Sequence, residues 1–437
     1  MKTFFHQTSR RKLRQNAILA GVHKKSERAA FEAGTLDELA SLCRTAGANV
    51  VGRITQVMDR FNPATLIGSG KVEELSRMIE DRSADLVVFD TTLAPSQQVN
   101  LEKRLSKQVI DRPALILDIF AIHAKTREAR AQVELAQMQY ILPRLAGGWT
   151  HLERQEGAIG TRGPGETQLE TDRRLVRKRI SDLKKQLVEI EGERHEQRKG
   201  RKDLFNVCLV GYTNAGKSTI FNRITGENVV AENYLFATLD STTRKVKLPR
   251  RDLMLLSDTV GFIRKLPVSL VASFKSTLLE ASEADLLLHV ISISDDDFED
   301  KIETVMETLN DIGCSAIPTI PLFNKIDLKN DPDLYVRLLR RYPGAHFVSG
   351  VTGEGVSTLL ASIENHLERS RVTIKTLIDA SDSQGYGLIS SLAYILDSIT
   401  RDGRVELKAR MPKARLGKLA RAGIEFRLVE NGRENEK

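Results

Sequence analysis

The chain has 437 residues, 41% of them hydrophobic and 28% charged, with a net charge of +8. Length and composition predict a soluble globular protein of roughly two to four domains. They exclude four features: no apolar run is long enough for a secretory signal or a membrane-spanning helix, and three cysteines give neither a disulfide framework nor a zinc pattern. We therefore expect a cytoplasmic protein without stable membrane insertion; peripheral membrane association stays an open alternative.

The charge is unevenly distributed. Residues 205–370 contain 17 Lys and Arg against 22 Asp and Glu, so the rest of the chain carries +13. Residues 1–28 hold eight basic residues and one acidic residue, and residues 401–421 hold eight and two. Such a surplus predicts contact with nucleic-acid phosphates, although solvated faces are the alternative. Aromatic residues make up only 5%, which argues against base stacking on single strands.

Residues 1–118 predict a small α/β domain. From residue 36 onward, helix-like and strand-like segments alternate. The last of them, residues 114–122, fits either a strand or the entry into the next helix. The preceding segments are a helix at 37–47, a strand at 49–58, a helix at 70–84, a strand at 85–90 and a helix at 95–105.

Residues 119–203 predict a long helical hairpin. Both 119–144 and 166–200 are charged and helix-forming. The second carries an apolar seam with the 4-3-4-3 spacing of packed helices, formed by Val176, Ile180, Leu183, Leu187 and Ile190. The glycine-rich connector at 147–170 is either flexible or a loop whose backbone amides and Arg162 contact phosphate or RNA.

Residues 371–437 predict a small, basic α+β domain. It begins with the segment 376–382. A helix through 387–399, a strand at 404–412 and a basic terminal helix are expected to follow.

A nucleotide-binding signal lies in the middle of the chain. A hydrophobic strand at 206–210 runs into G-x-x-x-x-G-K-S and then a helix. Gly211 and Gly216 let the backbone wrap phosphates, with amides pointing inward at a helix N-terminus. Lys217 reaches the β- and γ-phosphates, and the Ser218 hydroxyl ligates Mg²⁺.

Two further segments fit the sensing of a γ-phosphate. In "LFATLDSTTR", Thr238 is the candidate second Mg²⁺ ligand, with Thr242 and Thr243 as alternatives. In "DLMLLSDTVG", we expect Asp258 to hold the water shell of the metal and Gly261 to offer its amide to the γ-phosphate.

Two other segments identify the base as guanine. "PTIPLFNKID" ends a buried strand in N-K-x-D, and Asp327 can accept hydrogen bonds from guanine N1 and N2, a donor pair that adenine lacks. Asn324 braces this loop, and the stem of Lys325 covers the ring. In "HFVSGVTGEG", the backbone of Ser349 and Gly350 can contact O6. All five elements follow the carboxyl ends of strands, where ligands bind in open α/β sheets.

Together these segments predict a Mg²⁺-dependent GTPase that binds GTP and GDP, built as an α/β fold with a P-loop GTPase domain at 204–370. The predicted catalytic residues are Asn214, Lys217, Thr238 and Gly261, and the predicted metal ligands are Ser218 and Thr238. The predicted nucleotide-binding residues are Gly211, Tyr212, Thr213, Asn214, Ala215, Gly216, Lys217, Ser218, Thr219, Phe236, Ala237, Thr238, Leu239, Asp240, Asp258, Thr259, Val260, Gly261, Asn324, Lys325, Ile326, Asp327, Ser349, Gly350 and Val351.

Phe262 stands where small GTPases have the glutamine that orients the attacking water. Phosphoryl transfer depends mainly on positioning and charge neutralisation, so this loss is expected to slow catalysis without abolishing it. Asn214 has two interpretations. It helps hold a K⁺ ion beside the phosphates, as asparagine does in several GTPases that lack the glutamine, or it only tolerates the backbone angles of the turn.

The chain resembles the HflX family of ribosome-associated translational GTPases up to about residue 370. The resemblance rests on "GYTNAGKST", "LFATLDSTTR", "DTVGFI" and "NKID", and on "GSGKVEEL", "VVFDTTLAPSQQVNLE", "REARAQVELAQMQYILPRL" and "GTRGPGETQLETDRR" before them. It implies an N-terminal α/β domain, a helical hairpin, a GTPase domain and a C-terminal domain. It also implies Mg²⁺ as cofactor, binding to the large (50S) ribosomal subunit near its peptidyl-transferase region, and GTP-dependent splitting of stalled or stress-arrested ribosomes. Some members are also implied to hydrolyse ATP through an N-terminal region that has no phosphate-loop motif here.

The sequence departs from the family pattern at three places: "ISISD" follows "LLLHV", no proline follows the aspartate of D-S-T-T, and the tail beyond 374 matches weakly. An alternative function is a ribosome-assembly or rRNA-binding factor in which GTP only controls affinity. In either case we expect rRNA, ribosomal proteins and guanine nucleotides as partners, no DNA, and a monomer.

Overall fold

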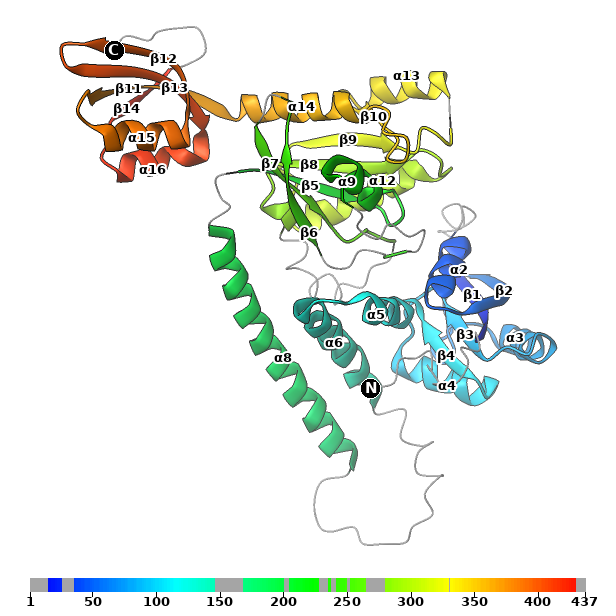
Figure 1. Ribbon diagram of the computed structural model, residues 1–437. Coiled ribbons are helices and arrows are strands. Elements are labelled where there is room, and N and C mark those ends of the chain that lie inside the picture. Colours follow the sequence, from blue (N-terminus) through cyan, green and yellow to red (C-terminus); the bar gives the residue numbers. More distant parts are fainter. Residues whose placement is uncertain are drawn as a thin grey trace.

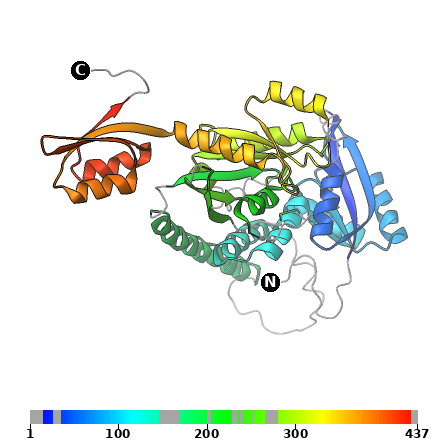
Figure 2. The same ribbon diagram turned by 45° about the horizontal axis from the view of Figure 1, so that its top comes forward.

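The computed structural model describes residues 15–25, 35–145, 168–199, 204–227, 235–236, 241–249, 252–264, 280–329 and 331–429. These residues form two four-stranded sheets and one six-stranded sheet. In Figures 1 and 2, the first and the last sheet lie on opposite sides of the six-stranded sheet. The predicted fold class is confirmed: a P-loop α/β domain stands between an N-terminal α/β part with a helical hairpin and a C-terminal α+β part.

The first sheet is parallel, with the strand order β2-β1-β3-β4. Its central strand β1 was missed by the sequence analysis, in which the alternating pattern began at residue 36. Ala17 and Leu19 of β1 pack toward α2 and α5, and Ile18 and Ala20 pack toward α3 and α4. The elements are β1 (Asn16–Lys24), α2 (Thr35–Thr45), β2 (Asn49–Met58), α3 (Ser69–Asp81), β3 (Leu86–Phe89), α4 (Pro95–Leu105), β4 (Gln108–Asp111) and α5 (Arg112–His123).

The ambiguous segment at 114–122 is helical and belongs to α5. The side chain of Asp111 caps this helix by accepting a hydrogen bond from the backbone N–H of Ala114 at 3.0 Å, and Pro113 occupies the first turn. The helix is buried from residue 112 to residue 120, so it lacks the one-sided periodicity that would have identified it. It also runs across residue 118, where we placed the first domain boundary; the division into domains stays a prediction.

The helical hairpin consists of α6 (Arg127–Ile141) and α8 (Gln168–Lys199), with a short 3-10 helix, η2 (Leu142–Arg144), after α6. Three residues of the predicted seam, Ile180, Leu183 and Leu187, pack against Ala131, Leu135 and Met138 of α6. Beside the seam, Arg179 makes a bidentate ion pair with Glu134. The connector with Arg162 lies outside the described residues.

The central sheet has the order β10-β9-β8-β5-β7-β6 and is parallel except for β6, which pairs antiparallel with β7. β5 therefore lies at the centre, between β8 and β7, and its carboxyl end carries the glycine-rich loop. The elements are β5 (Phe205–Gly211), α9 (Lys217–Thr225), β6 (Thr242–Lys247), β7 (Leu253–Asp258), β8 (Leu286–Ser292), α12 (Phe298–Asp311), β9 (Thr319–Asn324), α13 (Pro332–Arg341), β10 (His346–Phe347) and α14 (Val356–Arg369).

The C-terminal sheet is antiparallel, with the order β12-β13-β11-β14. The predicted helix through 387–399 is wrong beyond Leu392, because residues 394–401 form a strand. Asp402 and Gly403 both have positive φ, 49° and 74°, in the turn that joins this strand to the next, and Asp-Gly is a strong hairpin signal that we overlooked. The elements are β11 (Arg371–Asp379), α15 (Ser383–Leu392), β12 (Tyr394–Arg401), β13 (Arg404–Pro412), η3 (Lys413–Arg415), α16 (Leu416–Arg421) and β14 (Phe426–Val429).

Within the described ranges, none of the helices combines the length and the apolar character needed to cross a bilayer.

Candidate nucleotide site

The phosphate loop connects the end of β5 to the start of α9, as predicted. Gly211 and Gly216 have φ of 149° and 93°, a region that favours glycine. A Cβ atom at Gly211 would lie 2.3 Å from the carbonyl oxygen of Val290, and one at Gly216 would lie 2.2 Å from Nδ2 of Asn324. Both glycines are therefore required by tight contacts with β8 and with the N-K-x-D loop, in addition to any contact with phosphate.

Lys217 lies under the loop and is 6% exposed. Its ammonium group donates to the carbonyl oxygens of Gly211 at 3.1 Å and Tyr212 at 2.9 Å. Burial lowers the pKa of Lys217 to about 8, against the opposing effect of the Asp258 carboxylate. A Cβ atom at Gly261 would come within 2.9 Å of the lysine Nζ, so the structure brings this lysine and Gly261 together as the sequence predicted.

Ser218 and Asp258 also meet. The serine hydroxyl donates to Oδ2 of Asp258 at 2.6 Å, and Asp258 is buried at the end of β7. A hydroxyl and a carboxylate at this distance are the hard oxygen donors that Mg²⁺ selects, so the residues fit the metal predicted for the site. Thr238, the candidate second ligand, lies outside the described residues, together with Ala237, Leu239 and Asp240.

The loops predicted to bind the base are joined to the phosphate loop through Asn324. Its side-chain amide donates to the carbonyl oxygen of Ala215 at 2.8 Å and accepts from the backbone N–H of Gly350 at 3.0 Å. This agrees with the bracing role expected for Asn324. Asp327 is exposed, as a carboxylate that receives a base should be, and Ser349 is fully buried. Val351 and the other residues of this set keep their predicted roles as proposals.

Arg223 of α9 belongs to the same region and was missed by the sequence analysis. Its guanidinium donates to the carbonyl oxygens of Gly350, at 3.2 Å, and Val351. These bonds hold the loop after β10 against the helix that follows the phosphate loop. An arginine two turns into a helix carries no local signal for this role, because its partners lie more than 120 residues away.

Phe262 is a packing residue in this structure. Its backbone N–H donates to Gly211 at 3.1 Å, and its carbonyl oxygen accepts from the N–H of Thr213 at 2.8 Å. The ring is 2% exposed and joins an apolar cluster with Phe236 and Phe120. The backbone of Phe262 therefore holds the segment after β7 against the phosphate loop. Its side chain, at the position of the usual glutamine, is buried.

Phe236 connects the segment before β6 to the N-terminal part. It has φ of 61°, and its ring meets the ring of Phe120 in α5 edge to face, with centroids 4.6 Å apart. We predicted Phe236 as a nucleotide contact. The structure places its side chain in the apolar cluster instead, at 3% exposure, so only its backbone is left for that role.

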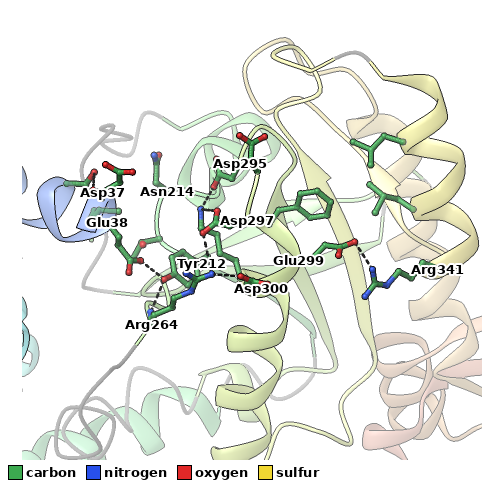
Figure 3. A pocket seen from close by; sticks show the side chains of 18 of the residues that line it. Asp37, Glu38, Tyr212, Asn214, Arg264, Asp295, Asp297, Glu299, Asp300 and Arg341 are labelled. Atoms are coloured by element: carbon green, nitrogen blue, oxygen red, sulfur yellow. Dashed lines mark hydrogen bonds and ion pairs between the residues drawn. The ribbon is translucent and has the colours of Figure 1, made fainter. Parts of the chain in front are cut away.

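A polar chain runs from the phosphate loop into the N-terminal sheet. The hydroxyl of Tyr212 donates to Glu38 of α2 and accepts from the backbone N–H of Arg264 at 2.8 Å (Figure 3). Glu38 also accepts from Arg112, which is 1% exposed and donates to Asp90 at 2.7 Å. Burial and the Glu38 carboxylate raise the pKa of Tyr212. No short-range pattern links residue 38 to residue 212, so the sequence could not predict this contact.

A cavity of about 1070 Å³ opens beside this chain, between α2 and α12. Most of the charged side chains that line the cavity are acidic, and Figure 3 shows several of them around Tyr212 and Asn214. The acidic lining residues are Asp37, Glu38, Asp295, Asp296, Asp297, Glu299 and Asp300, and the basic ones are Arg264, Lys301, Arg337 and Arg341. An excess of carboxylates repels a triphosphate, so this cavity does not define the position of the nucleotide.

The strand, glycine-rich loop and helix, the adjoining Ser218–Asp258 pair and the Asn324 brace together define a P-loop GTPase. Residues 33–121 match the family described as GTP-binding GTPase N-terminal, residues 123–201 match GTP-binding GTPase Middle Region, and residues 206–325 match 50S ribosome-binding GTPase.

The chain belongs to the HflX family of GTPases, on the strength of relatives that cover most of its length. It is 46% identical to GTPase HflX of Magnetococcus marinus, over 90% of this chain and 93% of the relative. It is 52% identical to that of Flavobacterium psychrophilum, over 72% and 76%, and 44% identical to that of Escherichia coli K12, over 86% and 89%. The predicted family and the predicted GTPase activity are thereby confirmed.

Proposed function

We propose that this GTPase binds the large (50S) ribosomal subunit and uses GTP to split stalled or stress-arrested 70S ribosomes. Two findings support the proposal. The match of residues 206–325 to a family described as 50S ribosome-binding GTPase indicates the partner. The charge of +13 outside residues 205–370 suits contact with rRNA through parts of the chain other than the GTPase domain.

The observation that carries the proposal is the buried contact between the nucleotide loops and the N-terminal part. Tyr212 of the phosphate loop bonds to Glu38, and Phe236, beside the candidate γ-phosphate sensor, packs on Phe120. A rearrangement that follows loss of the γ-phosphate would change these contacts directly. The nucleotide can thus alter how the N-terminal part and the hairpin are presented to a partner.

Within the site we assign the following roles. Lys217 contacts the β- and γ-phosphates, the Gly261 amide contacts the γ-phosphate, and Asp258 orders the metal's waters. Ser218 and Thr238 would hold Mg²⁺, which, when bound, neutralises charge on the β- and γ-phosphate oxygens. Asp327 accepts from the guanine ring. Because Phe262 is buried, we infer slow intrinsic hydrolysis that a large partner accelerates by ordering the switch segments.

The K⁺ hypothesis concerns Asn214, which has φ of 61°. This value satisfies the conformational interpretation, since Asn is among the few residues that tolerate the left-handed region. The variant Asn214→Gly separates the two interpretations, because glycine keeps the backbone angle and removes the side-chain amide. If Asn214 helps to hold K⁺, GTP turnover is faster in KCl than in NaCl at equal ionic strength, and the variant loses this difference. Identical wild-type rates in the two salts would remove the K⁺ hypothesis.

Light scattering on intact 70S particles tests the splitting activity. The protein with GTP is expected to lower the scattering as subunits separate, whereas GDP leaves it unchanged. Lys217→Ala should abolish the effect, and Lys247→Ala, at an exposed position on β6 of the GTPase domain, is the matched control. Association with precursor large subunits alone, without any change in 70S scattering, would contradict splitting and favour the assembly factor.

Stimulation of hydrolysis gives a second, independent measurement. Purified large subunits are expected to raise the GTP turnover of a cytoplasmic, monomeric enzyme, and small subunits are not. Equal turnover with both subunits would contradict the large subunit as partner.

A further inference from the structure

The C-terminal sheet has one covered and one open face. α15 and α16 lie together on the same side of this sheet (Figures 1 and 2). The side chains on that side form a closed apolar core of Ile374, Ile378, Ile389, Leu392, Leu407, Ala409, Met411 and Leu419. Because side chains alternate along a strand, Lys375 and Leu377 of β11 and Glu406 and Lys408 of β13 face the other way.

The open face carries a row of cations across three strands. Lys375 of β11 is paired directly with Lys408 of β13 on one side and with Arg427 of β14 on the other. Neighbouring strands are about 4.8 Å apart, so three positive groups stand side by side. Like charges directly opposite one another destabilise a sheet. Asp397 of β12 is paired with Lys408 at one end of the row.

Residues 371–429 contain eleven Lys and Arg and six Asp and Glu, and four of these basic residues belong to η3 and α16. On the open face outside the row, Arg401 and Arg404 are balanced by Asp379 and Glu406. Arg401 and Arg404 lie in one row with Asp379, which pairs with Arg404 at 3.6 Å. Arg371 and Arg410 bond to acids at the junction with the GTPase domain.

The four-stranded sheet with both helices on one side is the arrangement through which common RNA-binding modules present a flat face to RNA. Those modules stack bases on aromatic side chains of the two middle strands. Here the open-face positions of the middle strands, β11 and β13, are occupied by Thr373, Lys375, Leu377, Glu406 and Lys408 between the ends, with no aromatic ring. Tyr394, 71% exposed, lies on an edge strand. The chemistry therefore fits phosphates better than unstacked bases.

We propose that the open face of the C-terminal sheet is an RNA-binding surface, on which Lys375, Lys408 and Arg427 contact the phosphate backbone of structured RNA. The inference rests on the proposed function for the source of that RNA, which is the rRNA of the large subunit. It assigns this unit a role that the weak family resemblance beyond residue 374 does not supply.

The test uses the full-length protein and large-subunit rRNA stripped of ribosomal proteins, with binding measured against salt. The triple variant K375Q/K408Q/R427Q should bind this RNA about tenfold or more weakly than wild type, with the slope of log affinity against log salt flatter by about 3. The matched control K413Q/K418Q/R421Q removes the same charge from the α16 side of the unit and should lose much less. If thermal unfolding shows that the triple variant is not folded, Lys408→Gln alone should flatten the slope by about 1.

The outcomes separate this inference from the proposed function. Unchanged rRNA binding by the triple variant overturns the inference, even where wild type binds 50S particles and splits 70S particles. Loss of 50S binding with unchanged binding to stripped rRNA also overturns it and indicates a ribosomal protein as partner. Weakened, less salt-dependent rRNA binding supports it, even where 70S particles are not split.

Discussion

The two ends of the chain join the GTPase domain in different ways. The N-terminal part shares an apolar core with it: one cluster contains Leu19 and Phe120 together with Tyr212, Phe236 and Phe262. The C-terminal part has a core of its own, drawn only from residues 374–419. Its junction is polar, with Arg371 bonded to Asp252 at 2.5 Å and Arg410 bonded to Glu368 at 3.0 Å, beside a cavity of about 790 Å³.

We infer from this difference that the N-terminal part responds to the bound nucleotide and that the C-terminal part does not. A shared core cannot move on one side without repacking on the other, so a change at the phosphate loop reaches the N-terminal sheet. Partly exposed ion pairs are weak and tolerate reorientation. We therefore expect nucleotide state to alter the N-terminal part and to leave the C-terminal sheet as a surface of constant shape.

The largest expected effect comes from Phe120→Ala, which leaves a cavity in the core shared by the N-terminal part and the GTPase domain. Truncating a buried phenylalanine costs about 3–5 kcal/mol of the free energy of unfolding, and here it should also change GTP affinity. Ile389→Ala, in the separate C-terminal core, should cost about 2–5 kcal/mol in the unfolding of that unit and leave GTP affinity unchanged. Denaturant unfolding measures the change in stability of each variant, and nucleotide titration measures the change in its GTP affinity. Equal effects of the two variants on GTP affinity would contradict a closer coupling of the N-terminal part to the nucleotide site.

Phe262→Gln introduces the residue that small GTPases have at this position and should not confer their mechanism. The amide would replace a ring that is 2% exposed, and a buried amide without partners costs about 1–3 kcal/mol in addition to the lost packing. We expect a less stable protein whose GTP turnover is no faster, with Phe262→Leu as the apolar control. Faster turnover of the glutamine variant alone would mean that this side chain can reach the nucleotide.

Tyr212→Phe removes a single hydroxyl from the contact with the N-terminal sheet. The Arg264 N–H then loses its acceptor and Glu38 loses a donor, a loss of about 1–3 kcal/mol in unfolding free energy. Tyr394→Phe, at an exposed position of β12, removes a hydroxyl from the other end of the chain and should change stability by less than about 0.5 kcal/mol. Equal values for the two variants would contradict the difference between the ends.

Nucleotide binding should weaken above pH 8 because of Lys217. Its pKa of about 8 in the protein alone is raised when phosphates come near, so binding above that pH requires uptake of a proton. Affinity should be constant below pH 8 and then fall about tenfold per pH unit, a change of about 1.4 kcal/mol. Lys217→Arg, which stays protonated, is the control. A wild-type affinity that follows the arginine variant across pH 7 to 9 would contradict this mechanism.

The smallest effect is expected at the polar junction. Asp252→Asn removes one partner of Arg371 and should lower the unfolding free energy by no more than about 1 kcal/mol, because both side chains are partly exposed. GTP affinity should stay at the wild-type value. A change in affinity would show that the C-terminal part also responds to the nucleotide site.

The nucleotide chemistry could be predicted from the order of the amino acids. The glycine-rich loop between β5 and α9, the N-K-x-D loop and the Asp258–Gly261 segment each follow a buried strand, so local pattern alone places them at one edge of the sheet. The 4-3-4-3 seam of α8 could also be predicted from the sequence, because helical periodicity is a property of a single segment. These features depend on contacts close in sequence or on a fixed strand–loop–helix order.

The surroundings of the nucleotide loops could not be predicted in this way, because they depend on contacts between distant segments. Glu38 meets Tyr212, Phe120 meets Phe236, and β1 takes the centre of its sheet, although no short-range pattern connects any of these partners. The buried position of Phe262 and the cation row on the C-terminal sheet likewise depend on register and packing between distant segments. Long-range pairing is selected by the free energy of the whole core, so it cannot be read from any one stretch of sequence.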